Sequence, residues 1–550
     1  MFAGKVWPLK ARLLTHRGYA IRKDSLSVAE TSALRKALTV KPFVPEQFSA
    51  GITPFPVFYE SPTRWYTPRF WGIEHCGPLA PEDDLRRPGK PLRPELRFSK
   101  TLRPEQVPIV DAFKDGGCNG LICIPCGGGK TFVSIYTAVE VVKKQFIILV
   151  HQEFLADQWE KELKDAVPGI RVGRVQGSTV QLGVVDVPPP TVDSLKAELK
   201  ARGLQTGGRK AELVARLAEA DAGAGVGAKP VETYDCVICM IQTIASRDWA
   251  ADAFADFGFT IGDECHHLGA EHFSKALAAI QTLHMLGLSA TPNRADGLDR
   301  VFLQFIGPVR YQIKVREADD SVEVRVIRFT SADPVYANTP LDRMGEVSRP
   351  QLCNQLASYM PRTLTICNVL EPSVREGRQL LILSDRREHL AAFETEFRRR
   401  GFTSIGYYVG GMKTAERDES AKCMIVLGTF TLAAEGMNIR ALNTIALVTP
   451  KSKIEQAVGR ILRLKKEERT FAPVIYDVLD APHEVCVRQY RKRRQFYKQC
   501  AYAVQFVATN KGPQSQCQGE VEDGPVDEGV DEDNAPPTTH VARKPMFRSQ

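Results

Sequence analysis

No apolar run in this sequence of 550 residues approaches the length of a membrane-spanning helix. The amino terminus, MFAGKVWPLKARLL, also lacks the apolar core of a secretory signal peptide. The hydrophobic fraction of 43% and the charged fraction of 25% are those of an ordinary globular protein, and the length predicts several domains. We therefore expect an intracellular protein without a membrane partner.

The sequence also lacks the features of a disulfide framework. Its 13 cysteines are odd in number and scattered through apolar stretches, which is typical of a reducing compartment. Cys123 and Cys126 form one C-x-x-C pair, and Cys236 and Cys239 form another. Neither pair has a partner His or Cys at the spacing of a zinc knuckle. We predict that these cysteines pack in the core and bind no metal.

Acidic residues are unevenly distributed along the chain. Residues 517–533 carry eight acids and no Lys or Arg, so the formal charge of +8 leaves +16 on the rest of the chain. A body that basic favours a polyanionic partner such as nucleic acid, although a solvated basic surface gives the same net charge. The Pro-, Gly- and acid-rich residues 508–550 are predicted to be a disordered tail.

The stretch GLICIPCGGGKTF, residues 120–132, is typical of a phosphate-binding loop. A short apolar strand breaks into three glycines, whose backbone N–H groups can turn toward one anion, and a helix follows. Lys130 would reach the β- and γ-phosphates of a nucleotide, and the Thr131 hydroxyl would hold Mg²⁺. Ile124 stands where the usual motif has its first glycine, and a plain Gly-rich turn is the alternative. The predicted nucleotide-binding residues here are Pro125, Cys126, Gly127, Gly128, Gly129, Lys130 and Thr131.

From Phe98 onward, strand and helix patterns alternate, which predicts a parallel α/β architecture. In LRPEQ, just upstream of the loop, Arg103 and Gln106 are candidates to read an adenine edge, because a glutamine amide both donates and accepts. The alternative is an ordinary helix start. Downstream, in VHQEFLADQW, we expect Trp159 to serve in packing.

Three later segments predict polar residues at strand ends. FTIGDECHHLG ends in adjacent carboxylates, of which Asp263 would hold Mg²⁺ and Glu264 would orient and deprotonate the attacking water. YDCVICMIQTI predicts a strand ending in Gln242 and Thr243. LGLSATP places two hydroxyls, of Ser289 and Thr291, at the end of another strand, where ordinary turn hydrogen bonds are the alternative.

Residues 188–222 interrupt this rhythm. A Pro triplet and a Gly/Ala linker bracket two short helical patterns with paired leucines and a Gly-rich turn. The segment resembles the SAP DNA-binding module, which places Lys200, Arg202, Arg209 and Lys210 near phosphates. A plain helical hairpin is the alternative.

Residues 1–96 contain a Pro- and aromatic-rich section. Its aromatic side chains are interleaved with Arg64 and Arg69, so they either stack on bases or form the core of a small β-rich domain, and we favour the core. The aromatic residues concerned are Phe58, Tyr59, Trp65, Tyr66, Phe70 and Trp71.

The second half of the chain repeats strand and helix patterns after a strand-rich connection, YQIKV and VEVRVIRF. In IEQAVGRILR, residues Gln456, Arg460 and Arg463 recur at helical spacing on one face. An arginine fork is suited to a γ-phosphate because it binds bidentately and stays charged. We expect a solvated basic face on the later helix around QYRKRRQFYKQC.

GGGKT, D-E-x-H, S-A-T and Q-x-x-G-R-x-x-R, in this order, resemble the motifs of a superfamily 2 helicase over about residues 98–505. LRPEQ, VHQEFLADQW and GLSATPNRADGL are most similar to XPB-type transcription and repair helicases and to the poxvirus transcript-release helicase, and the aromatic domain resembles helicases of large DNA viruses. The resemblance implies two tandem RecA-like domains that hydrolyse ATP with Mg²⁺. Lys130, Glu264 and Gln456 would be catalytic, with Arg460 and Arg463 completing the site. Asn438 departs from the family, which usually has Asp there.

The resemblance therefore implies an α/β fold in five parts. They are an accessory domain (1–96), a first RecA-like domain (97–187 and 228–312), the SAP-like insertion (188–222), a second RecA-like domain (313–507) and the tail (508–550). Nucleic acid would contact Gln242, Thr243, Thr429, Lys200, Arg209 and Lys210, and coupling would use His266, Ser289, Thr291 and Gly436.

The function implied is an ATP-dependent DNA helicase or translocase acting in transcription or repair. The alternatives are an RNA remodeller and a nucleic-acid-binding factor with a vestigial motor. Oligomeric state, polarity and the choice among nucleus, cytoplasm and viral particle are left open by the sequence.

Overall fold

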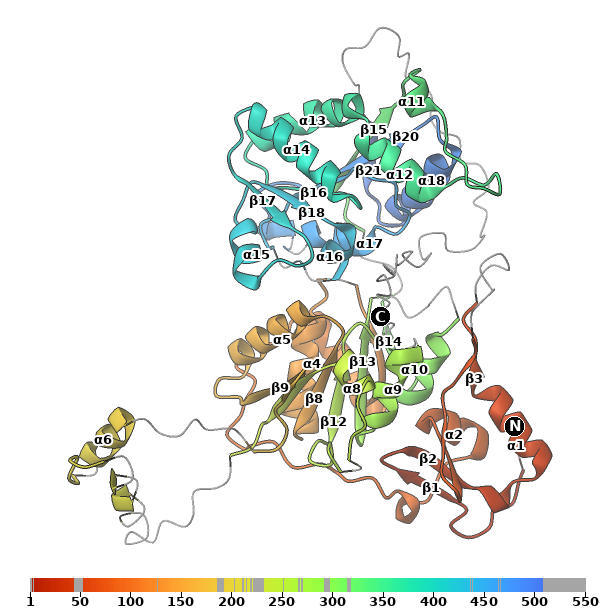
Figure 1. Ribbon diagram of the computed structural model, residues 1–550, viewed down its shortest axis with the longest axis vertical. Coiled ribbons are helices and arrows are strands. Elements are labelled where there is room, and N and C mark those ends of the chain that lie inside the picture. Colours follow the sequence, from red (N-terminus) through yellow and green to blue (C-terminus); the bar gives the residue numbers. More distant parts are fainter. Residues whose placement is uncertain are drawn as a thin grey trace, which may run out of the picture. The chain divides into compact units, whose positions relative to one another are not determined.

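The computed structural model divides the chain into two compact units (Figure 1). The first comprises residues 1–44, 49–124 and 129–312, and the remainder of the chain forms the second. The residues that it describes are 2, 4–43, 53–125, 127–184, 192–201, 203–209, 212–213, 215–217, 220, 232–250, 252–265, 268, 271–290, 297–313, 318–435, 437, 439–462, 464 and 466–507.

The first unit is built on an eight-stranded sheet with the order β10-β9-β11-β8-β12-β13-β7-β14. All neighbouring strands are parallel except β10 and β9. The strands are β7 (Asn119–Cys123), β8 (Phe146–Val150), β9 (Val172–Gln176), β10 (Thr179–Val180), β11 (Cys236–Met240), β12 (Phe259–Gly262), β13 (His284–Ser289) and β14 (Val309–Gln312). Apolar runs such as FIILV in β8 are buried throughout, as a parallel sheet covered on both faces requires.

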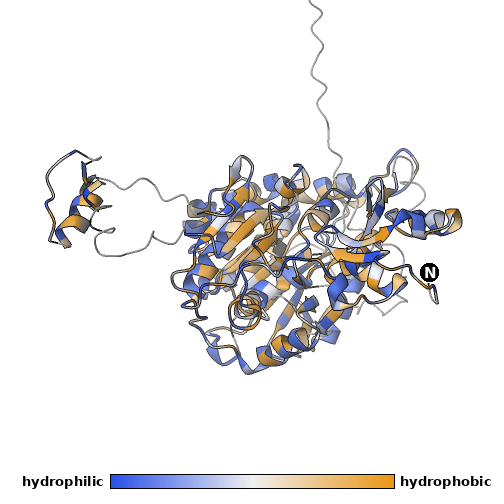
Figure 2. Cartoon of the chain, turned by 90° about the horizontal axis from the view of Figure 1, so that it is seen from below, coloured by the Kyte–Doolittle hydropathy of each residue, from blue (hydrophilic) through white to orange (hydrophobic). Residues whose placement is uncertain are grey.

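Helices cover both faces of this sheet (Figure 1). On one face Trp159 of α5 packs in a core with Ile122 of β7, and on the other Phe302 of α10 packs with Leu121. The helices are α3 (Val107–Asp115), α4 (Lys130–Tyr136), α5 (Glu153–Ala166), α8 (Ile241–Ala245), α9 (Glu271–Ala279) and α10 (Asp299–Ile306), and α4 continues as a π-helix over Thr137–Val142. Figure 2 shows the hydrophobic strands enclosed by helices whose outer sides are hydrophilic.

The amino-terminal part forms its own antiparallel sheet, β1-β2-β6-β5, within the first unit. Arg69 anchors it: its guanidinium donates to the side-chain oxygen of Asn119, at 2.6 Å, and to the carbonyl of Leu283, at 2.9 Å. Trp65 and Trp71 are buried, which agrees with the core interpretation of the aromatic residues. The elements are β1 (Arg12–Thr15), β2 (Gly18–Arg22), α1 (Val28–Ala37), β3 (Thr39–Val40), β4 (Phe55–Pro56), β5 (Tyr59–Glu60), β6 (Arg64–Thr67) and α2 (Arg69–Cys76).

The second unit contains a seven-stranded sheet in which all neighbours are parallel, in the order β17-β18-β16-β19-β20-β15-β21. Its strands are β15 (Glu323–Phe329), β16 (Leu380–Leu383), β17 (Ile405–Tyr408), β18 (Ile425–Gly428), β19 (Thr444–Leu447), β20 (Val474–Asp480) and β21 (Ala503–Phe506). Its helices are α11 (Pro334–Ala337), α12 (Arg349–Ser358), α13 (Met360–Arg375), α14 (Arg387–Arg399), α15 (Thr414–Ser420), α16 (Phe430–Glu435), α17 (Glu455–Val458) and α18 (Glu484–Gln499). The chain thus has the two RecA-like domains that the sequence predicted.

One local prediction was wrong. Gln242 and Thr243 do not end a strand, because β11 stops at Met240 and both residues lie on α8. The strand-rich segment after residue 308 is divided between the two sheets. Its first part, β14, pairs with β7, and its second part, β15, lies between β20 and β21 in the second sheet. These pairing partners lie far along the chain, and local patterns do not specify them.

The inserted segment contains α6 (Val192–Ala201). Leu195 and Leu199 of this helix form a small apolar cluster with Leu213 and Leu217, against which Leu204 packs. The leucines that the sequence paired on two helical patterns therefore share one core, as a helical hairpin requires.

Candidate active site

Three strands of the first sheet bring predicted site residues to one edge. β13 lies between β7 and β12, and Ser289 at the end of β13 pairs in register with Cys123 at the end of β7. Because the strands are parallel, the segments that follow β7, β12 and β13 all emerge at the carboxyl edge, where open α/β sheets bind ligands. The glycine loop and the Asp263-Glu264 pair follow two of these strands.

The glycine loop has the conformation that its sequence predicts. Gly127 and Gly129 have φ values of +87° and +83°, in the left-handed region that favours glycine. Gly129 is the N-cap of α4, so Lys130 and Thr131 open the helix, with Thr131 half-buried. A Cβ atom at Gly129 would lie 2.1 Å from Nε2 of Gln106, so the close approach of that side chain also requires glycine.

Gln106 and Arg103 lie against the glycine loop, as the nucleotide-binding prediction requires. Gln106 is only 3% exposed, and its Oε1 accepts a hydrogen bond from the backbone N–H of Arg103 at 2.9 Å. A Cβ atom at Gly129 would also meet Nη2 of Arg103, at 3.0 Å. The two residues therefore flank the place where Lys130 begins its helix.

Lys130 and Glu264 form an ion pair across this edge. The distance from Nζ to Oε1 is 3.0 Å, and the two side chains are 12% and 9% exposed. Glu264 has φ +45°, a left-handed conformation that is uncommon for residues other than glycine and that gathers at functional sites. An anionic phosphate can replace the carboxylate as the partner of Lys130, which would free Glu264 to accept a proton.

Asp263 is held beside this pair by two donors. Its Oδ2 accepts the indole N–H of Trp159 at 2.8 Å, and its Oδ1 accepts the backbone N–H of Glu264 at 3.0 Å. Burial raises the pKa of Asp263 above its usual range, and the neighbouring Glu264 charge adds to the rise. A divalent cation would oppose this rise by favouring the carboxylate.

Trp159 was assigned to packing, and the structure adds a polar contact to that role. The Trp159 side chain is 2% exposed and packs in the core between α5 and the sheet. The spacing of Leu155, Trp159 and Leu163 in the sequence places them on one face of the helix, which is buried. Because a buried indole N–H needs an acceptor, this spacing could have indicated the polar contact.

The predicted nucleic-acid contacts lie at several places. Gln242 donates its amide to the carbonyl of His151 at 2.7 Å, and the buried Thr243 hydroxyl accepts from the N–H of Gly177 at 3.0 Å. Thr429 follows β18 in the second unit and is half-buried, whereas Lys200 and Arg209 are exposed in the inserted segment. The other site predictions fall outside the described residues: Cys126, Arg202, Lys210, His266, Thr291, Gly436, Asn438 and Arg463.

In the second unit, Gln456 lies on α17, which ends at Val458, and Arg460 lies on the 3₁₀ turn that follows. Arg460 is 6% exposed and donates to the carbonyls of Ala433 and Met437 at 2.6 and 3.1 Å. The roles of Gln456, Arg460 and Arg463 at a phosphate stay predictions.

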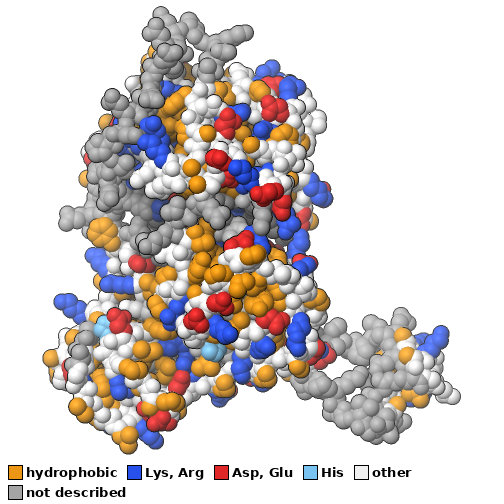
Figure 3. Space-filling model, turned by 180° about the vertical axis from the view of Figure 1, so that it is seen from behind, with side chains coloured by type: hydrophobic (Ala, Val, Ile, Leu, Met, Phe, Trp, Pro, Cys, Tyr) orange, Lys and Arg blue, Asp and Glu red, His pale blue; other side chains and the backbone are white. Residues whose placement is uncertain are grey.

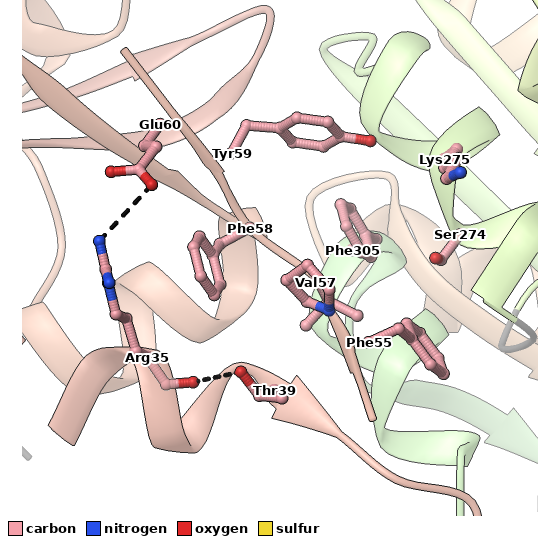
Figure 4. Close-up of a pocket in the computed structure, with 11 residues that line it drawn as sticks. Arg35, Thr39, Phe55, Val57, Phe58, Tyr59, Glu60, Ser274, Lys275 and Phe305 are labelled. Carbon is pink, nitrogen blue, oxygen red and sulfur yellow. Dashed lines mark hydrogen bonds and ion pairs between the residues drawn. The ribbon is translucent and has the colours of Figure 1, made fainter. Parts of the chain in front are cut away.

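A separate cavity of about 550 Å³ lies within the first unit, between the amino-terminal part and helices α9 and α10 (Figure 4). Tyr59, which is 47% exposed, and Phe58 line it beside Arg35 and Lys275. Glu60 lies 3.5 Å from Arg35. The cavity therefore combines aromatic surface with both signs of charge, and it is lined by none of the residues around the glycine loop.

Three further features of the described residues are the surface charges, the buried cysteines and the lengths of the helices. On the face shown in Figure 3, basic and acidic side chains are interspersed over both units. Cys236 and Cys239 are buried in β11, and burial raises the pKa of both thiols, as expected of packing residues. Among the helices of the described residues, none has the length and apolarity needed to cross a membrane.

Comparisons with known proteins found two family models that match this chain. The family described as "Type III restriction enzyme, res subunit" matches residues 99–294, and the "Helicase conserved C-terminal domain" matches residues 362–465. The first match contains the glycine loop and Asp263-Glu264, and the second contains Gln456 and Arg460.

Three relatives show how far the likeness extends. A protein of Acanthamoeba polyphaga mimivirus, named as an ATP-dependent RNA helicase, is 25% identical over 507 residues, which cover 90% of this chain and 86% of that protein. The protein named DNA 3'-5' helicase XPB from Kineococcus radiotolerans is 24% identical over 74% of this chain and 64% of that protein. An African swine fever virus protein, also named as an ATP-dependent RNA helicase, is 23% identical over 49% of this chain and 56% of that protein.

The two family matches follow each other in the order of the two sheets. The first match lies in the first unit apart from residues 125–128, and the second match lies in the second unit. The first contains a lysine and two carboxylates converging beside a glycine loop. The chain therefore contains the two domains of a superfamily 2 helicase and is an ATP-hydrolysing enzyme.

Proposed function

We propose that this enzyme is a DNA helicase or translocase that acts in transcription or repair. The observation that carries the proposal is the meeting of Lys130, Glu264 and Asp263 beside a loop in which Gly127 and Gly129 adopt left-handed conformations. Such a loop presents several backbone N–H groups to one anion. The DNA preference, the pathway and the residue roles below are parts of this proposal.

In the proposed reaction, Lys130 leaves Glu264 and binds the β- and γ-phosphates of ATP. Glu264 then orients the attacking water and takes its proton as the bond to the γ-phosphate breaks. Gln106 and Arg103, which lie against Gly129, would contact the adenine.

Asp263 and Thr131 would hold Mg²⁺, with Glu264 nearby. Among the described residues, no group of three or more His, Cys, Asp or Glu side chains is arranged to hold a metal ion. This fits Mg²⁺, which binds nucleotide sites through one or two protein groups and completes its shell with phosphates and water. When bound, the ion would neutralise charge on the phosphates.

Gln456, Arg460 and Arg463 would stabilise the charge on the transferring phosphate, as arginine forks do in related reactions. His266, Ser289, Thr291 and Gly436 would couple the nucleotide to the nucleic acid, and Gln242, Thr243 and Thr429 would contact its backbone. Because such contacts are mainly to phosphate, we expect little sequence preference and a strong salt dependence.

The inserted helical segment supports DNA as the substrate. Its four core leucines form the apolar cluster expected of a SAP-like hairpin, and Lys200 and Arg209 are exposed on it. The name of the XPB relative, DNA 3'-5' helicase, points the same way. RNA is the alternative, because the mimivirus and African swine fever virus relatives are named as RNA helicases.

The test is to measure ATP hydrolysis by the full chain with single- and double-stranded DNA and RNA of matched length. We expect double-stranded DNA to give the largest stimulation. Replacement of both Lys200 and Arg209 by Glu should weaken that stimulation. The rate of ATP hydrolysis in the absence of nucleic acid should stay unchanged. Stimulation by RNA alone would overturn the DNA assignment and leave the ATPase intact.

Lys130→Ala provides the control for the motor itself. We expect it to lower hydrolysis at least about 100-fold, because it removes the cation nearest the transferring charge. If the variant retains full biological activity, the motor is vestigial and the proposal is wrong.

A further inference from the structure

The indole of Trp159 contacts Asp263, although Trp159 itself has no role in the proposed mechanism. Trp159 lies on α5, Asp263 directly follows β12, and the two residues are 104 positions apart in the sequence. The indole ring is 2% exposed and Asp263 is 9% exposed, so the hydrogen bond between them is shielded from solvent. A shielded bond from a neutral donor to a carboxylate is stronger than the same bond at the surface.

Ion pairs and apolar packing hold helix α5 against the sheet, so the position of the indole donor is fixed. Arg174 of β9 forms ion pairs with Asp157 at 2.7 Å and with Glu160 at 3.0 Å, on both sides of Trp159 in the sequence. The apolar face of the helix packs on the sheet through Leu155 and Leu163. The indole N–H therefore has little freedom to follow Asp263 if that carboxylate turns.

The carboxylate is consequently held at both oxygens. The indole donates to Oδ2, and the backbone N–H of Glu264 donates to Oδ1. Together these two donors define the plane of the carboxylate. Each oxygen keeps a further lone pair for another ligand.

We propose that Trp159 is a positioning residue, which orients Asp263 for the divalent cation that accompanies ATP. This inference rests on the proposed ATPase function. Groups that hydrogen-bond to metal ligands in this way set the ligand's orientation, and their loss typically weakens metal affinity by a factor of 10 or more.

Two substitutions separate the hydrogen bond from the packing. Trp159→Phe fills more of the indole's volume but cannot donate. Trp159→His is smaller, but its five-membered ring superimposes on the pyrrole half of the indole, and Nε2–H can donate from nearly the same place. If packing alone matters, Phe should be the better replacement, and if the donor matters, His should be better.

Trp249→Phe is the matched control. Trp249 lies in the same unit, and its indole donates to the carbonyl of Ile244 at 3.0 Å, so the substitution also removes one indole hydrogen bond. Its indole bonds to Ile244 and its ring lies against Phe254, neither of which is a proposed site residue.

The experiment measures the binding of Mn²⁺ to the full chain in the presence of ADP, by electron paramagnetic resonance of the free ion. Binding of fluorescent ADP in EDTA and thermal unfolding are measured alongside. We expect Trp159→Phe to weaken Mn²⁺ binding about tenfold. Trp159→His should recover at least half of that loss on a logarithmic scale, and Trp249→Phe should match the wild type. Metal-free ADP binding should change less than about twofold in all variants.

Unchanged Mn²⁺ affinity in Trp159→Phe would overturn the inference, as would a His variant that binds Mn²⁺ no better than the Phe variant. If Trp159→Phe does not fold, the comparison of Trp159→His with the wild type decides, since an affinity loss above tenfold in a folded His variant contradicts the donor role. Failure of the wild type to bind ADP at all would instead refute the proposed function.

Discussion

The two parallel sheets of this protein use buried charge differently. In the first, the cation of the Lys130–Glu264 pair stands at the carboxyl edge, where its side chain is 12% exposed. In the second, Asp480 pairs with Arg362 and Asp477 with Arg493, and these four side chains are at most 3% exposed. The arginines come from α13 and α18, helices that cover the second sheet.

The pairs of the second sheet belong to larger buried hydrogen-bond networks. Arg362 contacts both oxygens of Asp480, at 2.6 and 2.9 Å, and also the carbonyl of Val448, while Tyr336 donates to the same carboxylate. Removing one member of such a network leaves a buried charge unpaired. The Lys130–Glu264 pair, by contrast, can exchange its carboxylate for a phosphate. Partial exposure beside a glycine loop thus marks a pair that a ligand can open.

The largest expected effect tests the exchangeable pair. Glu264→Gln should lower the rate of ATP hydrolysis by a factor of roughly 10² to 10⁴, because a positioned general base contributes about that much. It should leave ATP binding and thermal unfolding close to the wild type, since the amide keeps the shape of the side chain. Steady-state kinetics and calorimetry check this, and an equal loss of stability would remove the contrast with the second sheet.

Arg362→Met should have the opposite profile. We expect it to destabilise the second unit by about 3–5 kcal/mol, because Asp480 keeps a buried charge without its partner. Hydrogen exchange measured by mass spectrometry should show faster exchange in β20 and β19, with the strands of the first sheet unchanged. Double replacement of Arg362 and Asp480 by Met and Leu should recover part of the stability, and no recovery would show that the loss has another cause.

The smallest expected effect concerns pH. His389 lies between the hydroxyls of Ser384 and Thr363, and burial, reinforced by the Arg362 charge, lowers its pKa to about 3 from an ordinary value of 6.5. Below pH 6.5 the unfolded chain binds a proton that the folded chain rejects, so stability falls by up to about 1.4 kcal/mol per pH unit.

His389→Gln should therefore flatten the loss of stability in the second unit between pH 6.5 and 4.5. The readout is the exchange rate of β16 amides as a function of pH, corrected for the intrinsic rate. The first sheet serves as the internal reference, and a variant that follows the wild-type pH profile would contradict the assignment.

Much of the first sheet could be predicted from local pattern. The apolar strand before Pro125, the glycines with positive φ and the strand ending before Asp263 all follow from short-range rules. The helix that places Gln242 and the strand pairing of β15 could not be predicted, because each depends on partners distant in sequence. The same holds for Arg493, which was expected on a solvated face and is instead bound to Asp477.

By itself, the sequence determined the chemistry of the glycine loop and of the two carboxylates, because backbone freedom and side-chain type are properties of neighbouring residues. Only the tertiary structure decided which of these groups meet. The strand order β8-β12-β13-β7 brings Trp159 to Asp263 and Lys130 to Glu264. The sequence of an apolar strand that is buried on both faces does not indicate which strands lie beside it. The strand order is therefore set by the packing of the whole sheet.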